Sequence, residues 1–577
     1  MSIKRVLQFV LSLVTLTIII QLVLFTNLPR GTRYRNRDNF FCDAIHIGVL
    51  HVTSATQLYK TLKFLVFYRN SPLHFHFFVN ETGAKIVNTL FETWHLPQVQ
   101  ISTYESKDSK STDTLDEKLQ SLRRPELLNH TDRLIVMGSN LLVMGDLQQF
   151  WDLFDHFQMS QVLGAVKRGD NKAETDIFLL DLSKLLSMTG PLNSATGVHF
   201  AAVNPQYLRW TYVENIVDKD ELNSVRAILS NMGQDIPPRR ISRCTDLHES
   251  NSTDAPTLPA CSSLPESQMF KRRTLLFIRR FSYAPKEHDV TLVTQFPYEK
   301  LDVFEAMCRR WLGPISATVY LSEADLEKTI DFIEKSSDLK RRYNVAYHAV
   351  FKRGEFRPMN YLRNVALRNV VTSHVFLADI DYLPMSKLHK TLLPYLAKMA
   401  THKKALVIPA FATNGSKPVS PLTVDELKEA WDKRFIIPLP EKTLGSEHLP
   451  TDYKRLRNAT EPYTIQWKPN HDPCIVVQSN VVEYDERFFG YGHGRVSHIL
   501  ELHTQNYEFI VLPNTFVVYL DHLKGRDYEQ FAKDDYRSCL QAIIEQNVDD
   551  LNRKYGTKYN ITNLYGEPTK SSVVNTT

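Results

Sequence analysis

The sequence predicts an α/β protein, in which two tandem α/β domains follow a single N-terminal transmembrane helix. Short apolar runs alternate with amphipathic helical stretches through both halves of the 577-residue chain, a pattern typical of parallel sheets with helical crossovers. Residues 6–25 carry no charge and are just long enough to span a bilayer. With 43% hydrophobic and 23% charged residues, the chain is ordinary globular material but too long for one core.

Residues 6–25 are predicted to be an uncleaved signal anchor, between a cytoplasmic tail at 1–5 and a stem at 26–41. Lys4 and Arg5 precede the segment, and no small-x-small cleavage site follows it. Arginines on the far side leave the orientation ambiguous by charge alone.

The orientation is inferred from Asn-x-Ser/Thr sequons, which are spread over the chain after the anchor. One sequon arises easily by chance, but together they favour a lumenal bulk and hence a type II membrane protein of the secretory pathway. The expected N-glycosylation sites are Asn80, Asn129, Asn251, Asn414, Asn458, Asn560 and Asn575.

Charge and cysteine content exclude two classes of site. The net charge of +5 is small for this length and no basic tract occurs, so no nucleic-acid surface is expected. The six cysteines are widely spaced, with no CxxC or Cys/His cluster, so no structural zinc site is expected. One or two disulfides suit the compartment, and spacing leaves their pairing open. The cysteines are Cys42, Cys244, Cys261, Cys308, Cys474 and Cys539.

The first half is predicted to form strands at 44–51, 73–79 and 133–137, and helices at 57–68, 84–94 and 146–157. The third strand ends in Gly138-Ser139-Asn140, where two carboxylates would be needed for a metal-bound diphosphate. Residues 170–270 contain Pro237-Pro238 and a Ser/Thr/Pro-rich patch, and are expected to be the irregular end of the first domain plus a linker.

The second half repeats this plan, so we expect two related domains, at 42–285 and 286–566, with a C-terminal tail at 567–577. Ser322 and Asp325 form a predicted capping box at the start of a helix. The predicted strands are 289–295, 317–321, 345–351, 375–378 and 406–411, and the predicted helices are 301–311, 324–335, 359–370 and 496–502.

Asp379 and Asp381 follow the apolar strand at 375–378 and precede Pro384, which ends the extended segment. Carboxylates at positions i and i+2 of an extended chain point the same way. Two hard oxygen ligands at the end of a buried strand suit Mg²⁺ or Mn²⁺ carrying a diphosphate. A solvated acidic turn is the alternative explanation.

Residues downstream supply the other candidates. A transferase that inverts a sugar needs a carboxylate to accept the proton of the acceptor hydroxyl, and Asp472, Asp485 and Glu486 are available. Gly-containing turns let backbone approach a sugar closely, and aromatic rings can stack on it; a turn with core aromatics is the alternative. These candidates are Gly490, Gly492, Tyr491 and Trp467, with His522 as a further metal ligand.

Several motifs of the second half occur in the order and spacing of one known family. They are Leu362-Arg363-Asn364-Val365-Ala366, Phe376-Leu377-Ala378-Asp379-Ile380-Asp381, Tyr484-Asp485-x-Arg487-Phe488, Gly490-Tyr491-Gly492 and Tyr507-Glu508-Phe509-Ile510-Val511-Leu512-Pro513-Asn514. This half resembles the glucuronyltransferase domain (glycosyltransferase family 49) of the LARGE family, Golgi xylosyl- and glucuronyltransferases that extend matriglycan on dystroglycan. It is more distantly similar to the single-domain beta-1,4-glucuronyltransferase.

The resemblance implies a Rossmann-like GT-A domain that inverts the sugar and uses UDP-glucuronate with Mn²⁺ or another divalent metal. Asp379, Asp381 and His522 match the metal ligands. Arg363 and Asn364, with Asp379, are expected to contact the UDP-sugar donor. Asp485 matches a carboxylate of the family and is the expected base. Asp472, which stands where the family has Glu before Pro, is the second candidate, and Glu486 is set aside because it aligns with a position that need not be acidic. His493-Gly494-Arg495 departs from the family pattern and puts acceptor choice in question.

The first half resembles the family's xylosyltransferase domain (glycosyltransferase family 8) at Ile45-His46-Ile47, at Asn70-Ser71-Pro72-Leu73-His74-Phe75-His76 and at Gln161-Val162-Leu163-Gly164. Where that domain keeps its Asp-x-Asp, this chain has Gly138-Ser139-Asn140. We therefore expect a catalytically inactive domain with a structural or acceptor-binding role.

The sequence as a whole predicts a Golgi type II glycosyltransferase with one active domain, which adds glucuronate to a glycan acceptor in protein O-glycosylation, the O-mannosyl pathway of the family. A homodimer is compatible with the sequence. The alternatives are another donor, UDP-xylose or UDP-N-acetylglucosamine, on the same fold, and an inactive lumenal glycan-binding protein.

Overall fold

The structure is a computed structural model. The predicted anchor, His522, Asn251 and Asn575 lie outside the residues that it describes. No helix among the described residues is both long and apolar enough to cross a membrane. The described residues are 33–35, 41–50, 52, 54–94, 96, 98–106, 115–143, 145–158, 161–167, 173–187, 199–203, 210–212, 258–264, 272–398, 402–414, 420–443, 448–520, 531, 533–560 and 564.

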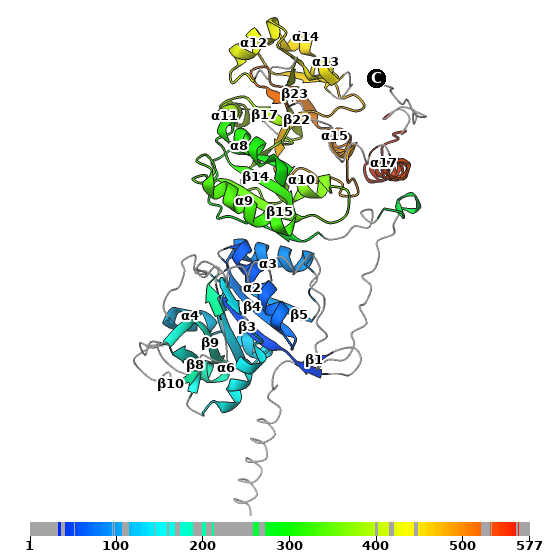
Figure 1. The fold of residues 1–577 in the computed structure, drawn as a ribbon. Coiled ribbons are helices and arrows are strands. Elements are labelled where there is room, and N and C mark those ends of the chain that lie inside the picture. The colour runs from blue at the N-terminus through cyan, green and yellow to red at the C-terminus, as the bar shows by residue number, and fades with distance from the viewer. Residues whose placement is uncertain are drawn as a thin grey trace, which may run out of the picture. The chain divides into compact units, whose positions relative to one another are not determined.

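The chain divides into two compact units, one formed by residues 1–87 and 96–249 and the other by residues 88–95 and 250–577. Each is a mixed α/β structure built on one large sheet (Figure 1). We call them the first and second unit and describe each by itself.

The first unit contains a seven-stranded sheet (Figure 1). Its strands, in spatial order, are β10 (His199–Val203), β8 (Gln161–Lys167), β9 (Ala173–Asp181), β6 (Arg133–Gly138), β3 (Ile45–Leu50), β4 (Leu73–Val79) and β5 (Val99–Glu105). Two short ribbons pair β1 (Arg33–Arg35) with β2 (Phe41–Asp43) and β7 (Leu141–Val143) with β11 (Trp210–Tyr212). The helices of this half of the chain are α2 (Ala55–Tyr68), α3 (Glu81–Thr93), α4 (Leu115–Leu122), α5 (Gln148–Trp151) and α6 (Leu182–Ser187), with 3-10 turns η1 (Pro125–Asn129) and η2 (Asp152–His156).

The second unit contains a nine-stranded sheet and a smaller four-stranded one (Figure 1). The large sheet runs β12 (Thr274–Leu275), β15 (Val345–Phe351), β14 (Ile315–Leu321), β13 (Val290–Pro297), β16 (His374–Leu377), β22 (Cys474–Gln478), β18 (Lys404–Ile408), β23 (Glu508–Val511) and β21 (Tyr463–Ile465). The small sheet runs β17 (Tyr382–Pro384), β24 (Val517–Tyr519), β19 (Ala410–Thr413) and β20 (Ile436–Pro438).

Helices connect these strands. The helices of the second unit are α8 (Leu301–Arg310), α9 (Glu323–Lys335), α10 (Met359–Leu367), α11 (Leu388–Lys398), α12 (Val424–Asp432), α13 (Leu439–Thr443), α14 (Tyr453–Leu456), α15 (Gly494–Thr504) and α17 (Asp534–Tyr555). The predicted capping box of Ser322 and Asp325 is present at the start of α9. The strands β14, β15 and β16 are buried along their whole length, as expected for parallel strands covered on both faces.

The two units share one topology. Numbered along the chain, the seven strands from β3 to β10 (β7 apart) lie in the order 3-2-1-4-6-5-7, and the matching strands β13 to β16, β18, β22 and β23 lie in the same order. Parallel and antiparallel pairings also agree at every step. The large sheets of the two units therefore have the same strand order and the same pairing directions.

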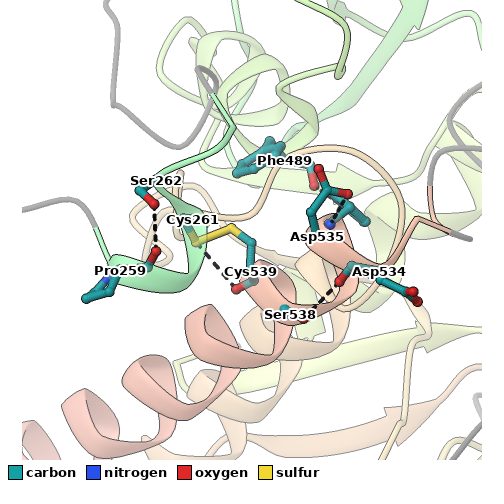
Figure 2. The surroundings of a disulfide bond; sticks show 9 residues. Pro259, Cys261, Ser262, Phe489, Asp534, Asp535, Ser538 and Cys539 are labelled. Carbon is teal, nitrogen blue, oxygen red and sulfur yellow. Dashed lines mark hydrogen bonds between the residues drawn. A yellow bond between two sulfur atoms is a disulfide. The ribbon is translucent and has the colours of Figure 1, made fainter.

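A disulfide joins Cys261, at the end of η4 (Pro259–Cys261), to Cys539 in the second turn of α17 (Figure 2). The bond spans 278 residues of sequence and pins α17 to the segment that enters the second unit. Cys308 and Cys474 are buried thiols. The pairing of Cys261 with Cys539 was not derivable from spacing.

Most predicted strands agree with the observed ones to within about two residues. The predicted strand at 406–411 is two strands, β18 and β19, which lie in different sheets. The sequence analysis did not predict the strands β8 and β22. It also expected residues 170–270 to be irregular, whereas β9 lies inside the first sheet and α6 follows it.

Candidate active site of the second unit

The two predicted metal-binding carboxylates lie in the turn between β16 and β17. The amide of Ala378 still donates to the Val293 carbonyl on β13 (3.3 Å), after which the chain turns. A hydrogen bond from the Tyr382 amide to the Asp379 carbonyl (3.0 Å) closes the turn. Asp379 and Asp381 therefore lie in a turn and not on the extended chain that the sequence analysis expected, and they have different partners.

Asp379 is held by two arginines. Arg363 on α10 donates from Nε to Oδ1 (3.1 Å) and from Nη2 to Oδ2 (2.7 Å), the fork geometry of a strong ion pair. Arg495, in the first turn of α15, brings Nη1 within 3.5 Å of Oδ2. Burial alone would raise the pKa of Asp379, but the two guanidinium groups outweigh it and hold the pKa well below its usual value. The carboxylate is ionised at every physiological pH.

Asp381 forms an ion pair with Lys300. Lys300 ends the 3-10 turn η6 (Tyr298–Lys300) that follows β13. Because β13 and β16 are parallel neighbours, their C-terminal ends meet at one edge, and residues beyond them come together. Both side chains stay partly exposed, 25% for Lys300 and 22% for Asp381. We did not predict Lys300; its position after the strand next to β16 is the signal that could have found it.

Arg495 connects Asp379 to a second acid. Its Nε lies 2.9 Å from Oδ1 of Asp472, and its Nη2 donates to the Pro473 carbonyl (3.0 Å). The guanidinium also lies over the Tyr382 ring, 5.3 Å from its centroid. Although burial opposes the charge, Asp472 and Asp379 keep the pKa of Arg495 well above its ordinary value. The sequence singled out Arg495 only as a departure from a family pattern.

The side chain of Asp485 is bound by Arg487 and by α17. Arg487 donates from Nε to both oxygens (3.0 Å each) and from Nη2 to Oδ2 (2.6 Å). Asn547 on α17 donates to Oδ2 (3.1 Å), and Nη1 of Arg487 reaches Asp550 (2.8 Å). Asp485 thus fastens its loop to α17, whereas Asp472 shares a cation with Asp379.

Asn364 also binds the loop that contains Asp485. Its Nδ2 donates to the Tyr484 carbonyl (2.8 Å) and to Oε1 of Glu486 (2.9 Å), and its Oδ1 accepts from the Tyr484 amide (2.8 Å). These bonds use the side-chain amide within the protein and fix the loop on α10. The carboxylate of Glu486 is likewise paired, with Nη2 of Arg368 at 2.8 Å.

The glycine turn after this loop packs tightly on α17. Gly490 has φ of +65°, and a Cβ there would lie 2.6 Å from the Tyr536 hydroxyl. That hydroxyl donates to the carbonyls of Phe489 (2.6 Å) and Tyr491 (2.8 Å). Gly492, with φ of +105°, also needs the left-handed region. The glycines permit this close packing on α17, and the Tyr491 side chain is 52% exposed beside them.

Trp467 does not present an open stacking face. Its ring stacks on His503, with centroids 4.4 Å apart and planes 9° from parallel. It also packs against the small apolar cluster of Leu500, Val548 and Leu551. Its contacts are those of a core residue, the alternative left open by the sequence.

The equivalent turn of the first unit follows β6, which occupies the same place in its sheet as β16. There the chain has Gly138, Ser139 and Asn140, and the Ser139 carbonyl accepts from the Thr61 hydroxyl (2.9 Å). Shared topology therefore equates this neutral turn with the acidic turn of the second unit.

The donor set of the acidic turn fits a hard divalent cation such as Mn²⁺, because both Asp379 and Asp381 offer carboxylate oxygens at one edge of the sheet. Asp381 is the better placed, since its partner Lys300 is a flexible cation at a partly exposed position. Asp379 is held through both oxygens by Arg363.

Comparison with known proteins identifies the class of enzyme to which this site belongs. Residues 289–357 and 352–556 match a family model described as "Glycosyl-transferase for dystroglycan". The human xylosyl- and glucuronyltransferase LARGE1 is 28% identical, over 89% of this chain and 81% of its own. The mouse xylosyl- and glucuronyltransferase LARGE2 is 29% identical, over 89% of this chain and 88% of its own. This chain is therefore a glycosyltransferase, similar over most of its length to the LARGE proteins.

The family match encloses the acidic turn of this glycosyltransferase and every cation that we describe around it. Two solved structures are also similar. GalNAc-T7 with UDP, GalNAc and Mn²⁺ is 14% identical, with a TM-score of 0.30, over 47% of this chain and 55% of its own. Mouse xyloside xylosyltransferase 1 is 12% identical, with a TM-score of 0.20, over 25% and 69%. TM-scores this low do not establish a shared fold by themselves.

Proposed function

We propose that the second unit transfers glucuronate from UDP-glucuronate to a sugar hydroxyl of a glycan acceptor, with inversion and with a divalent metal. The observation that carries the proposal is the charge cluster at the end of β16. Asp379, Asp381 and Asp472 converge there with Arg363, Arg495 and Lys300, so three carboxylates meet three cations. A metal and a diphosphate of opposite charge can enter this cluster without leaving a net charge unpaired.

Asp379 and Asp381, with His522, would hold the metal, and the metal would neutralise the charge that develops on the departing UDP. Arg363 keeps Asp379 ionised and fixed in orientation. Lys300 pairs with Asp381, and its ammonium group would be released to bind a phosphate oxygen if a metal took that carboxylate. Asn364 would not contact the donor directly but would position the loop at 484–486, which its side-chain amide binds.

Asp472 is our first candidate for the general base, which takes the proton of the acceptor hydroxyl as the C1–oxygen bond to UDP breaks and the new glycosidic bond forms. It shares Arg495 with Asp379, so it belongs to the same charge cluster. Asp485 is the second candidate, and its four hydrogen bonds from the side chains of Arg487 and Asn547 favour a positioning role.

The first unit is proposed to be catalytically inactive, because the turn equivalent to Asp379-Ile380-Asp381 is neutral. Single-sugar addition is then expected rather than synthesis of an alternating polymer. We further propose that the chain is a Golgi type II membrane protein with a lumenal, N-glycosylated body. The five described sequon asparagines are all exposed, as glycan attachment requires: Asn80, Asn129, Asn414, Asn458 and Asn560.

The donor is tested with the full chain in detergent, offered a panel of UDP-sugars and acceptors that end in xylose or in glucuronate, with and without Mn²⁺. We expect manganese-dependent transfer from UDP-glucuronate only. Transfer from UDP-xylose or UDP-N-acetylglucosamine would replace the donor in the proposal. Manganese-dependent UDP binding without transfer from any donor would contradict it.

A further inference from the structure

Three histidines of the first unit come together on one face of its sheet. His46 on β3 and His74 on β4 are register partners on neighbouring parallel strands. His76 lies two residues beyond His74, and residues two apart on a strand share a face. All three are buried, with exposed fractions of 1%, 4% and 0%.

The ring nitrogens of these histidines are close enough to share one ion. Nδ1 of His46 lies 2.9 Å from Nε2 of His76. The rings of His74 and His76 have centroids 4.3 Å apart. Taking one nitrogen from each residue, all three lie within 4.8 Å of one another. Ligand nitrogens around a zinc ion at about 2.1 Å are roughly 3.4 Å apart, so small ring rotations suffice.

A second ring nitrogen of His74 and of His76 is already oriented by a neighbour. Nε2 of His74 bonds to the Ser102 hydroxyl (2.9 Å), and Nδ1 of His76 bonds to the Tyr104 hydroxyl (3.1 Å). Metal-bound imidazoles are usually held in this way through the nitrogen that does not bind the metal. Nδ1 of His74 is buried with no hydrogen-bond partner. A buried polar atom without a partner is costly, and a metal ion would satisfy it.

The rings are also in the form that binds metals. Burial, together with mutual repulsion among the histidines, lowers the pKa of His46 to about 3 and that of His74 to about 4. His130, at the end of η1, stacks edge-on over His74 with centroids 5.3 Å apart and covers the group. Uncharged imidazole is the ligand form of histidine.

We propose that His46, His74 and His76 bind one zinc ion, which stabilises the first unit. Three nitrogen ligands suit zinc rather than the hard cations that carboxylates bind. His46 and His74 lie at the start of β3 and β4, and His76 lies in the middle of β4, whereas the turn after β6 follows the C-terminal end of that strand. The three histidines are therefore separate from that turn. Cysteine spacing could not indicate it, because no cysteine takes part.

The test is the metal content of the full chain, purified in detergent, incubated with excess zinc and dialysed against a weak chelator. We expect one zinc per chain in the wild type and its loss in the double variant His74→Gln/His76→Gln. The control is His348→Gln, which removes a single buried histidine of the second unit and is expected to keep the zinc. Wild-type protein without zinc, or a double variant that keeps it, would overturn the proposal.

A second measurement decides the matter if the double variant does not fold. Wild-type protein loaded with Co²⁺ should show the intense visible absorption of four-coordinate cobalt with nitrogen ligands, and its thermal midpoint should rise with added zinc and fall with EDTA. The proposal would be overturned if the cobalt spectrum showed only the weak bands of six-coordinate cobalt and the thermal midpoint did not change with zinc. The histidines would then form a hydrogen-bonded network without a metal.

Discussion

At the residue scale, the two candidate bases differ in what holds them. Asp472 pairs with Arg495, which also pairs with Asp379, whereas Asp485 is tied to Arg487 and α17. A carboxylate can act as base only if the acceptor hydroxyl reaches it, and membership of the Asp379 cluster favours Asp472.

The variants Asp472→Asn and Asp485→Asn separate these roles. We expect Asp472→Asn to lower kcat about 10²- to 10⁴-fold, with UDP affinity unchanged by calorimetry. We expect Asp485→Asn to retain turnover and to lower the free energy of unfolding by about 1–3 kcal/mol, because it weakens the bonds to Arg487 and Asn547. The reverse pattern would make Asp485 the base.

A second residue-scale prediction concerns pH. Burial lowers the pKa of His348 to about 3, while in the unfolded chain it is near 6.5. Below pH 6.5 the unfolded state therefore binds a proton that the folded state does not, and stability is lost as the pH falls toward 3. Between pH 7.5 and 5.5 this histidine alone should cost about 1.4 kcal/mol.

The measurement is denaturant unfolding of wild type and His348→Gln at both pH values. Between pH 7.5 and 5.5 the free energy of unfolding should fall by about 1.4 kcal/mol more in the wild type than in the variant. Equal losses in the two proteins would contradict the assignment. A histidine within a continuous apolar run, as in the fully buried strand β15, indicates in the sequence a buried imidazole with a lowered pKa.

At the scale of elements, α17 organises the loop at 484–492 although it lies far along the chain. It supplies Asn547 and Asp550 to the Asp485–Arg487 pair and Tyr536 to the glycine turn. The disulfide with Cys261 fixes its N-terminal turns (Figure 2).

Gly490→Ala tests the glycine turn. The substitution should cost about 1–2 kcal/mol for the positive φ and about 1–3 kcal/mol for the clash with Tyr536. Gly556→Ala is the matched control, because Gly556 has a similar φ of +68° but nothing within 4 Å of its Cβ position. Thermal unfolding should show the larger loss for Gly490→Ala, with reduced glucuronate transfer for that variant alone. Equal losses would mean that the close approach to Tyr536 is unimportant.

Removing the disulfide tests the anchoring of α17. The double variant Cys261→Ser/Cys539→Ser should lower the free energy of unfolding by about 2–5 kcal/mol. Reduction of the wild type should reproduce that loss in denaturant unfolding, and reduction of the variant should add nothing. A wild type indifferent to reductant would argue against a structural role for the bond.

These elements also show where sequence reasoning stops. The strands around Asp379 were predictable, because buried parallel strands are continuous apolar runs. The orientation of Asp485 was not, because it is set by Asn547 on a helix whose own sequence is mostly polar. The sequence analysis noted the three histidines only as parts of a family resemblance. Their proximity depends on the register between β3 and β4, which the sequence of neither strand determines.

At the scale of the whole molecule, two units with one strand order differ in the chemistry of one turn. After β16 the chain presents Asp379 and Asp381 with three cations, and after β6 it presents Gly138, Ser139 and Asn140. Duplication followed by loss of the acids in one copy would account for this difference between units of the same strand order. The first unit would then be kept for its structure, and the proposed zinc ion at His46, His74 and His76 would stabilise it.

The most direct test of this account compares the two equivalent turns. Glucuronate transfer from UDP-glucuronate with Mn²⁺ is measured for Asp379→Asn and for Asn140→Ala in the full chain, with thermal unfolding as the check on folding. We predict that Asp379→Asn lowers the rate by on the order of 10²-fold or more while the protein stays folded, and that Asn140→Ala leaves the rate unchanged. Transfer that survives Asp379→Asn but is lost in Asn140→Ala would place the working site in the first unit and contradict the account.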